Sequence, residues 1–447
     1  MKDALRSQLW PVPLAAIIVA VVAGQLLPYL DREVGDDLLP SVSGWLFGGG
    51  PEAASNLLQT IAGAMVTVTS LTFSLTVVTL QLASSQFSPR LLRTFTRDRI
   101  VHNTLALFLA TFAFALTALR SVRAPSPSGE GFVPKFAITI AFLLAVASVL
   151  ALVGFLSHLA RQIRVESMLK LVHADAEDTV RRLFPEQDQP GALAAESVFG
   201  RGPGYRNIAS PSSGFLLTVD GGRLCEAAAA ADALIVLETT PGDSLVQGIP
   251  LARVAHVDGH PVDGRSFDDL AAQVEAAVTI GFERTLVQDA GLGLQQLLDI
   301  ACRALSPGIN DATTAVHAIG HVSSLLCGLV GRRTGSQLVR DEQGLARVLV
   351  RHPDLSDLID LALRQLLRYA MGDPRAAERT IKLLAELAWV DASGTLEPTL
   401  QGHRAQAADA LRHGPLNGAE TGHLLQFLQQ TAIPQGNGRP ESGPGPS

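Results

Sequence analysis

The sequence predicts a multi-pass α-helical membrane protein with four transmembrane helices and a cytoplasmic α+β region. Apolar residues are concentrated before Ser157, in four runs that are each long enough to cross a bilayer. The mean hydropathy of the whole chain is positive. The rest of the 447 residues alternates strand-like and amphipathic helical patterns, as soluble domains do. We therefore expect residues 1–157 to form the membrane domain.

The four predicted helices cover about residues 13–30, 57–84, 101–119 and 136–157. The first run is followed by Leu-Pro-Tyr-Leu-Asp and not by a small-residue cleavage site, so we interpret it as a membrane helix. With a cytoplasmic N-terminus, the inner flanks hold Lys2, Arg6, Arg90, Arg93, Arg97, Arg99, Arg161, Arg164 and Lys170. The outer flanks hold only Arg32, Arg120, Arg123 and Lys135. The positive-inside rule then predicts that both termini lie in the cytoplasm.

The second predicted helix carries ordered stripes of hydroxyl and small side chains. A spacing of seven residues, with interleaved positions, gives a first stripe of Thr60, Thr67, Ser70, Ser74, Gln81, Ser84 and Ser88. A second stripe, on roughly the opposite face, consists of Thr69, Thr72, Thr76 and Thr79. Small and hydroxyl residues let membrane helices approach closely and hydrogen-bond, so the first stripe is either a packing seam or the lining of a water path between several copies. The sequence leaves both interpretations open.

A basic amphipathic segment follows this helix. Pro89 is expected to kink or end the helix near Ser88. Beyond it, apolar residues alternate with Arg90, Arg93, Arg97 and Arg99. Such a segment is suited to the headgroup interface of a bilayer.

Beyond the membrane domain we expect a connecting helix and linker at residues 158–208, and then a small β-barrel module at 209–258. A helical domain at 265–430 and a disordered tail at 431–447 follow. The turn at residues 241–250 resembles the hairpin of barrel-sandwich hybrid domains, the fold of lipoyl and biotinyl carriers. The carrier lysine is missing, because no Lys occurs between Lys170 and Lys382. We therefore expect a structural or gating module without a cofactor.

Polar side chains surround a predicted helix-break-helix unit in the helical domain. They are Arg284, Asp289, Arg303, Asn310 and Asp311. Pro and Gly after residue 306 end the first helix, and Asn310 or Asp311 caps the next. The cluster is either an internal network that fixes the helices or a ligand or ion site at the second helix N-terminus.

Two histidines on the following helix, His317 and His321, stand at i and i+4. This spacing is able to hold a metal. No third ligand is evident in the sequence, so we expect no metal.

Two stretches of the sequence carry a family resemblance. One is Thr-Phe-Ser-Leu-Thr at 72–76 continuing to Gln-Leu-Ala-Ser-Ser-Gln-Phe-Ser-Pro-Arg at 81–90. The other runs from Gly-Phe-Glu-Arg-Thr at 281–285 to Ala-Leu-Ser-Pro-Gly-Ile-Asn-Asp-Ala-Thr-Thr-Ala at 304–315. Together they resemble the bacterial predicted membrane protein family called domain of unknown function 2254, which usually has Pro where this chain has Ala312. The resemblance implies a multi-pass membrane protein with a soluble C-terminal half, and it supplies no agreed activity.

The sequence favours transport over catalysis. It contains no P-loop, GxGxxG, GxSxG or HExxH motif, so we expect no enzyme, and its net charge of −7 gives no reason to expect nucleic acid binding. We expect an oligomeric ion channel or transporter with a cytoplasmic gating or regulatory region, because four spans with few charges make a poor pore alone. The alternative is a membrane-anchored sensor or scaffold that binds a ligand or protein through its cytoplasmic half. The expected partners are the lipid bilayer, further copies of the chain and an unidentified ion or small ligand.

Overall fold

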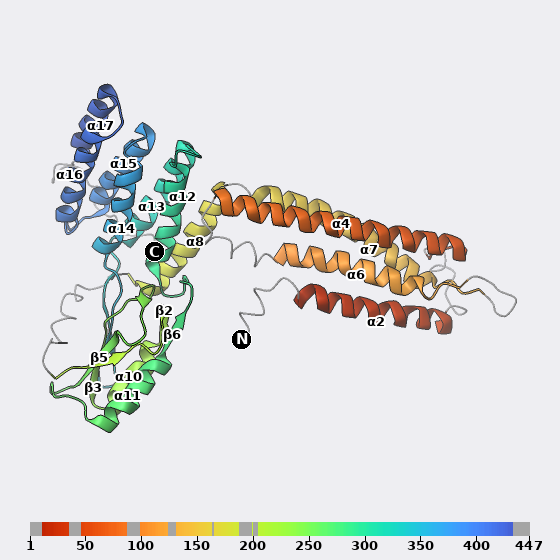
Figure 1. The fold of residues 1–447 in the computed structure, drawn as a ribbon, viewed down its shortest axis with the longest axis horizontal. Coiled ribbons are helices and arrows are strands. Elements are labelled where there is room, and N and C mark those ends of the chain that lie inside the picture. The colour runs from red at the N-terminus through yellow and green to blue at the C-terminus, as the bar shows by residue number, and fades with distance from the viewer. Residues whose placement is uncertain are drawn as a thin grey trace, which may run out of the picture. The chain divides into compact units, whose positions relative to one another are not determined.

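The computed structural model describes residues 11–34, 46–86, 99–123, 131–162, 165–186, 199 and 204–431. The chain divides into two compact units, Met1–Ser167 and Met168–Ser447, and each is described by itself (Figure 1).

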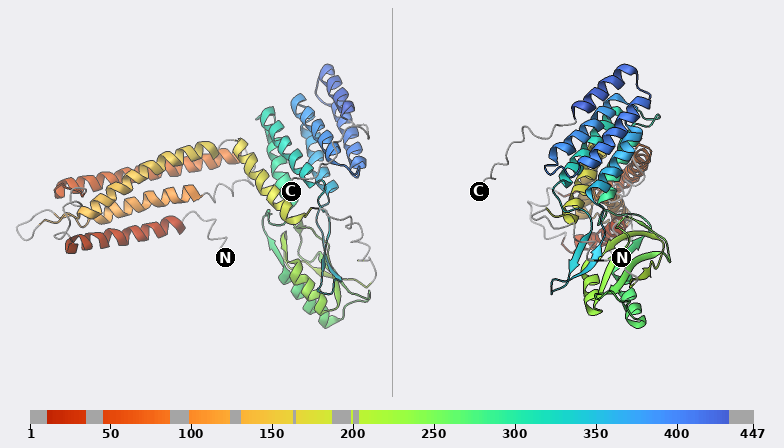
Figure 2. Two further views of the ribbon diagram at one scale, coloured as in Figure 1. Left: turned by 180° about the vertical axis from the view of Figure 1, so that it is seen from behind. Right: turned by 90° about the vertical axis from the view of Figure 1, so that its left-hand side faces the viewer.

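The described residues of the first unit form four long helices, α2 (Pro11–Val34), α4 (Pro51–Gln86), α6 (Arg99–Leu119) and α7 (Lys135–Gln162). Each predicted transmembrane segment lies inside one of them. The helices extend past the predicted ends, most at the start of α4, because hydropathy marks only the apolar part of a helix. Helix α6 contacts the other three helices, which lie alongside it in both ribbon views (Figures 1 and 2).

Alanine and aromatic side chains form the core of this unit. Ala54, Ala115, Ala118, Ala137 and Ala141 are fully or almost fully buried, which allows close helix packing around larger residues such as Leu58 and Phe114. Polar contacts also join neighbouring helices, both at their ends and near their middles. The backbone N–H of Phe136 donates to Asp31 Oδ2 at 2.9 Å, and the hydroxyls of Thr111 and Ser148 lie 3.1 Å apart.

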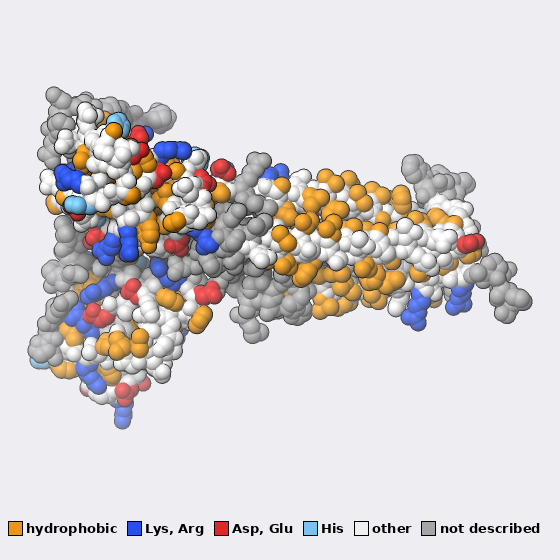
Figure 3. Space-filling view, turned by 45° about the horizontal axis from the view of Figure 1, so that its top comes forward, with side chains coloured by type: hydrophobic (Ala, Val, Ile, Leu, Met, Phe, Trp, Pro, Cys, Tyr) orange, Lys and Arg blue, Asp and Glu red, His pale blue; other side chains and the backbone are white. Residues whose placement is uncertain are grey.

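Apolar side chains, orange in Figure 3, cover much of the face of these helices that the view shows. Large exposed side chains include Val19 on α2, Phe73 on α4 and Leu150 on α7. Among the described residues, five helices are long and apolar enough to cross a membrane. The fifth is α13 (Ala312–Leu329), which packs against other helices of the second unit, so the predicted count of four is not confirmed by length and composition.

The second unit includes all but the first three residues of α8 (Val165–Leu183) and contains a mixed sheet of five strands. In spatial order these are β1 (Arg206–Ala209), β5 (Pro250–His256), β3 (Ala233–Leu237), β8 (Ala346–Val350) and β7 (Gln337–Arg340). Strands β3 and β8 pair in parallel, with Ile235 opposite Val348, and the other neighbours are antiparallel. A second sheet has the order β4 (Ser244–Leu245), β2 (Gly214–Val219) and β6 (Val278–Gly281).

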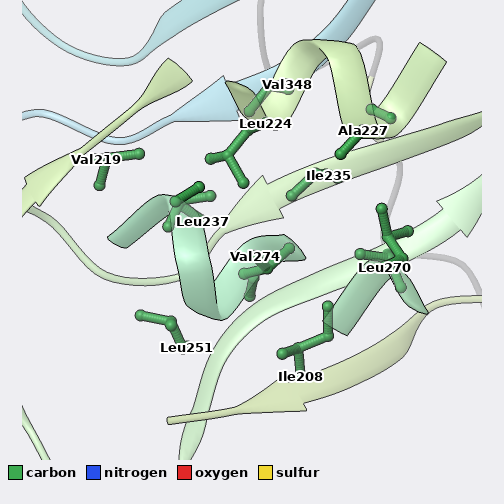
Figure 4. Packing of buried hydrophobic residues seen from close by; sticks show 14 of the residues in the cluster. Ile208, Val219, Leu224, Ala227, Ile235, Leu237, Leu251, Leu270, Val274 and Val348 are labelled. Atoms are coloured by element: carbon green, nitrogen blue, oxygen red, sulfur yellow. The ribbon is translucent and has the colours of Figure 1, made fainter. Parts of the chain in front are cut away.

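Helices α10 (Gly221–Ala230) and α11 (Gly264–Ala277) contribute to the core beside these sheets. Leu224 from α10 and Leu270 and Val274 from α11 pack with Ile235 and Leu251 from the strands (Figure 4). All five side chains are almost completely buried. Removing such area from water is the main stabilising contribution to this part of the fold.

This arrangement differs from the predicted barrel-sandwich module at 209–258. Strand β8 comes from about residue 346 and inserts beside β3, β6 completes the smaller sheet, and α10 lies between β2 and β3 in the sequence. Helix α10 forms because its alanine-rich sequence favours a helix, and Asp220 caps its start by accepting from Arg223 N. The predicted turn at Gly242 and Gly248 is present, and both glycines have positive φ values.

The remaining described residues form a helical bundle. Its members are α12 (Ala290–Ala304), α13, α14 (Leu355–Tyr369), α15 (Pro374–Val390), α16 (Glu397–His413) and α17 (Gly418–Gln430). The predicted helical domain at 265–430 thus also contains β6, β7 and β8. The predicted tail at 431–447 lies, apart from Thr431, outside the described residues.

Candidate functional site

The first stripe lies on the outer face of α4. Thr60, Thr67, Ser70, Ser74 and Gln81 are exposed in the single chain. The side chain of Ser84 and the whole of Ser88 lie outside the described residues. The opposite face of α4 is buried, with Leu58 and Thr72 at 0% exposure and Met65 at 4%. Most of the first stripe is therefore not used for packing inside its own chain, although Ser70 lines a cavity between α2, α4 and α6.

Threonine hydroxyls of the first stripe are satisfied within α4. Thr60 Oγ1 donates to Asn56 O at 2.7 Å, and Thr67 Oγ1 donates to Gly63 O at 3.2 Å. Such back-bonding lets a hydroxyl face lipid or another helix without an unpaired donor. Exposure of this stripe therefore does not by itself require water.

The second stripe faces inward. Thr72 and Thr79 are buried, and Thr79 Oγ1 donates to Leu75 O at 2.8 Å, whereas Thr72 Oγ1 has no partner among the described residues. Thr69 and Thr76 line an apolar cavity of about 660 Å³ between α2, α4 and α6. Ser70 of the first stripe lines the same cavity, whereas Thr60, Thr67, Ser74 and Gln81 do not.

The predicted interfacial arginines are not placed by the structure. Arg90, Arg93 and Arg97 lie outside the described residues, and Arg99 begins α6 but its side chain is not described.

The predicted cytoplasmic cluster is divided between the two ends of α12. Arg284 and Asp289 lie at its N-terminus, whereas Asn310 and Asp311 lie beyond its C-terminus and Arg303 is in its last turn. A helix of 15 residues is about 22 Å long, so these groups do not form one site.

Each part of the predicted cluster contains an aspartate that caps the N-terminus of a helix. Asp311 caps α13, and the hydrogen bonds from the Thr314 hydroxyl and amide lower the pKa of its carboxyl. Asn310 has φ +50°, a left-handed conformation that Asn tolerates. Asp289 caps α12 by accepting from Leu292 N at 2.9 Å, and it is only 4% exposed.

Arg284 holds Asp289 from the other side. Its Nε donates to Asp289 Oδ2 at 2.7 Å and its second guanidinium nitrogen donates to Oδ1 at 2.9 Å. A bidentate pair of this kind compensates the cost of burying the carboxylate.

The Arg284–Asp289 pair lies on a polar cavity of about 490 Å³. The cavity is enclosed by the turn after β3, the N-terminus of α12, the residues before β7 and the turn between β8 and α14. Its charged and imidazole lining consists of Asp243, Arg284, Asp289, Arg351, His352, Asp354 and Asp357. The sequence did not reveal this grouping, although the turn at residues 241–250 and the pair of Arg284 and Asp289 were each singled out separately.

His352 is the most buried titratable group that sequence reasoning did not anticipate in this cavity. It is 9% exposed, and its ring lies edge-on to Phe184 with centroids 6.0 Å apart. Burial lowers the pKa of His352 to about 4, so the ring is neutral at pH 7. Its Nδ1 is buried and has no hydrogen-bond partner among the described residues.

Of the two histidines at metal-binding spacing, His317 and His321, the second lies beside a third histidine. The ring of His321 lies 4.9 Å from that of His173 on α8, and burial, His173 and His317 lower the pKa of His321. Within the described ranges, no group of three His, Cys, Asp or Glu side chains is placed to hold a metal.

Comparisons with known proteins agree on one family. The family model described as "Predicted membrane protein (DUF2254)" matches residues 6–386. The chain is 33% identical over 393 residues to the uncharacterized proteins Rv1290c of Mycobacterium tuberculosis and Mb1321c of Mycobacterium bovis. Each match covers 86% of this chain and 73% of the relative. No solved structure matches.

Proposed function

The chain belongs to this family of predicted membrane proteins, and from that premise we propose that it assembles into a homo-oligomeric ion channel or transporter of the bacterial inner membrane. The observation that carries the proposal is the outward direction of the first stripe. A ring of copies that turns this face of α4 toward its axis has a path lined by hydroxyls and Gln81. Apolar residues beside the stripe, such as Phe73, are then available for contacts with neighbouring copies or lipid.

The proposed topology has four spans, namely α2, α4, α6 and α7. Helix α13 is apolar because it is packed among α12, α14 and α15, with Ile319, Val322 and Leu326 fully buried. This packing supports a place in the soluble bundle. The excess of basic residues on the inner flanks supports cytoplasmic termini and a cytoplasmic second unit.

The second unit is proposed to regulate the path. Helix α7 ends at Gln162 and α8 begins at Val165, so two residues separate the last span from the first helix of the second unit. So short a connection favours coupling between a change in α8 and the end of α7.

The channel proposal is tested on the intact protein. Its mass in detergent should be a multiple of the chain mass of 47.2 kDa, and liposomes that contain it should pass ions. A monomer that passes no ions under any buffer tested would refute the proposal.

A second candidate function is a membrane-anchored sensor. The polar cavity in the second unit favours it, because concave sites with several convergent polar groups are where small molecules bind. A strict monomer whose cytoplasmic half binds a ligand would support this alternative.

A further inference from the structure

The polar cavity lies where open α/β sheets bind ligands. Its walls include residues 240–243, which follow β3, and residues 351–354, which follow β8. These two strands are parallel neighbours, so their carboxyl ends meet at one edge of the sheet. Crevices outside the carboxyl ends of parallel strands are the common ligand sites of such sheets.

The helices beside the cavity do not offer free N-termini. Asp289 caps α12, while Asp354 caps α14 by accepting from Asp357 N at 2.8 Å. The Asp357 side chain accepts in return from Asp354 N at 3.1 Å. The amides that would attract a phosphate are thus already occupied by carboxylates.

The charge of the lining is negative. Two arginines line the cavity, Arg284 and Arg351, and Arg253 joins them through a shared ion pair. These three positive charges compare with five carboxylates, those of Asp243, Asp289, Asp354 and Asp357 in the lining and that of Glu238 beside it. Each guanidinium faces a carboxylate of its own or shares one. Arg284 is bound by Asp289, and Arg253 and Arg351 share Glu238 at 2.5 and 3.3 Å. Asp243, Asp354 and Asp357 form no ion pair with any described residue and line the cavity with unused acceptor capacity.

An independent observation points to a ligand here. His352 is more than nine-tenths buried and lines the cavity, yet its Nδ1 has no partner among the described residues. Buried polar atoms are nearly always hydrogen-bonded, directly or through water. An unpartnered ring nitrogen in a polar cavity is expected where a bound molecule or water completes the network.

We propose that this cavity binds a small organic cation with an ammonium group, held by Asp243, Asp354 and Asp357. The neutral His352 ring supplies an uncharged hydrogen-bonding wall. Anions are disfavoured by the surplus of carboxylates, and the described residues place no metal-binding group here. The inference gives a ligand class to the regulatory role proposed for the second unit, and rests on that proposal only for its physiological meaning.

The test is calorimetric titration of the full-length protein in detergent with putrescine and ethanolamine, and with inorganic phosphate as the anionic probe. Saturable binding of an amine and no binding of phosphate are expected. Asp243→Asn and Asp357→Asn each keep an acceptor oxygen for the Thr240 or Asp354 amide but remove a charge. Each should weaken amine binding about tenfold, the effect of one charge-assisted hydrogen bond.

Asp409→Asn is the matched control, because this acid lies exposed on α16 and pairs only locally with His413. It should leave the amine affinity unchanged. The two cavity variants lie on different elements, so one decides the matter when the other fails to fold. No amine binding at millimolar concentration, preferential phosphate binding, or a wild-type amine affinity in both cavity variants would each overturn the inference. None of these readouts depends on ion flux, so a failed channel assay leaves the result intact.

Discussion

The backbone of Gly242 lies directly against the carboxylate of Asp289. A Cβ atom at Gly242 would come 2.3 Å from Asp289 Oδ2 and 2.6 Å from its Cγ. Gly242 also has φ +102°, a region that other residues rarely adopt. The turn after β3 is therefore fitted against the cap of α12, and the two together form one wall of the polar cavity.

Replacing Gly242 with Ala should destabilise the second unit by more than backbone strain alone. The new methyl group would displace the Asp289 side chain and so disturb the Leu292 cap and the Arg284 pair. Gly248→Ala is the control, because it has φ +84° but open space around the missing side chain. We expect Gly248→Ala to cost about 1 kcal/mol or more, and Gly242→Ala to cost about 2 kcal/mol beyond that. Equal thermal unfolding midpoints for the two variants would contradict this close contact.

Removing the partner of Asp289 should be costly as well. Arg284→Met keeps much of the side-chain volume but leaves a carboxylate that is 4% exposed with only its capping hydrogen bond. We expect a loss of about 2 to 3 kcal/mol in the free energy of unfolding, measured by urea titration. Arg181→Met, at an exposed pair on α8, should cost less than about 1 kcal/mol. If Arg284→Met lost as little free energy of unfolding as Arg181→Met, the Arg284–Asp289 pair would not be needed for stability.

Acid should destabilise the second unit through His352. The unfolded ring takes a proton near pH 6.5, whereas burial lowers the native pKa of His352 to about 4. Between these values the unfolded state binds more protons, so stability is fully present above pH 6.5 and is lost as the pH falls toward 4. The full shift corresponds to a loss of about 3 kcal/mol. A lowered pKa of His321 acts in the same direction.

The measurement is the thermal midpoint of wild type and His352→Phe at pH 7.5 and pH 5. Phe retains the edge-on ring contact with Phe184 and should flatten the pH dependence. Asp311 and Asp391 are not confounding, because their carboxyl pKa values are lowered below 3.8 and they lose their contribution only in stronger acid. His413→Phe, at a ring that is 75% exposed, should retain the wild-type slope. An unchanged slope in His352→Phe would contradict the assignment.

Local patterns in the sequence predicted the four long helices of the first unit and the start of α13, although they missed α10. Apolar runs located α2, α4, α6 and α7, since a bilayer span needs an uninterrupted stretch that one window reveals. A cap residue located the start of α13, because Asp311, one of the two predicted caps, binds an amide only three residues away. A cap is contained within one turn of helix, and an apolar run within one continuous segment, so neither signal depends on distant residues.

The sheet and the polar cavity were not predictable in the same way. Strand β8 pairs with β3 across more than 100 residues, and no turn signal links them. Residues of the cavity likewise come from four separate segments. Conversely, Arg284 and Asp311 are near in sequence but are separated by the full length of α12. Sequence proximity across a helix break therefore grouped residues that the fold keeps apart.

The proposed orientation predicts which loops are accessible. A cysteine at Gly48, which is exposed and has open space around it, should react with a membrane-impermeant maleimide from the outer side of spheroplasts. A cysteine at Gly418, at the start of α17, should react only after permeabilisation. Both are made after replacing Cys225, Cys302 and Cys327 with Ser to remove background labelling. The reverse pattern would contradict cytoplasmic termini.

The central claim is that the first stripe of α4 lines a path between copies, and Ser74→Leu tests it most directly. Leu removes a hydroxyl and adds apolar volume, which favours dewetting of a narrow path. Ala15→Leu on α2 is the control, because Ala15 is also exposed and lies at a similar depth, where Leu14 and Phe73 line one cavity. The measurement is ion flux in liposomes together with oligomer mass in detergent for the same samples. The account predicts that Ser74→Leu loses flux and keeps its oligomer mass, while Ala15→Leu keeps both. Loss of the oligomer would make the stripe a packing seam, and unchanged flux would remove it from the mechanism. Either result would contradict the claim.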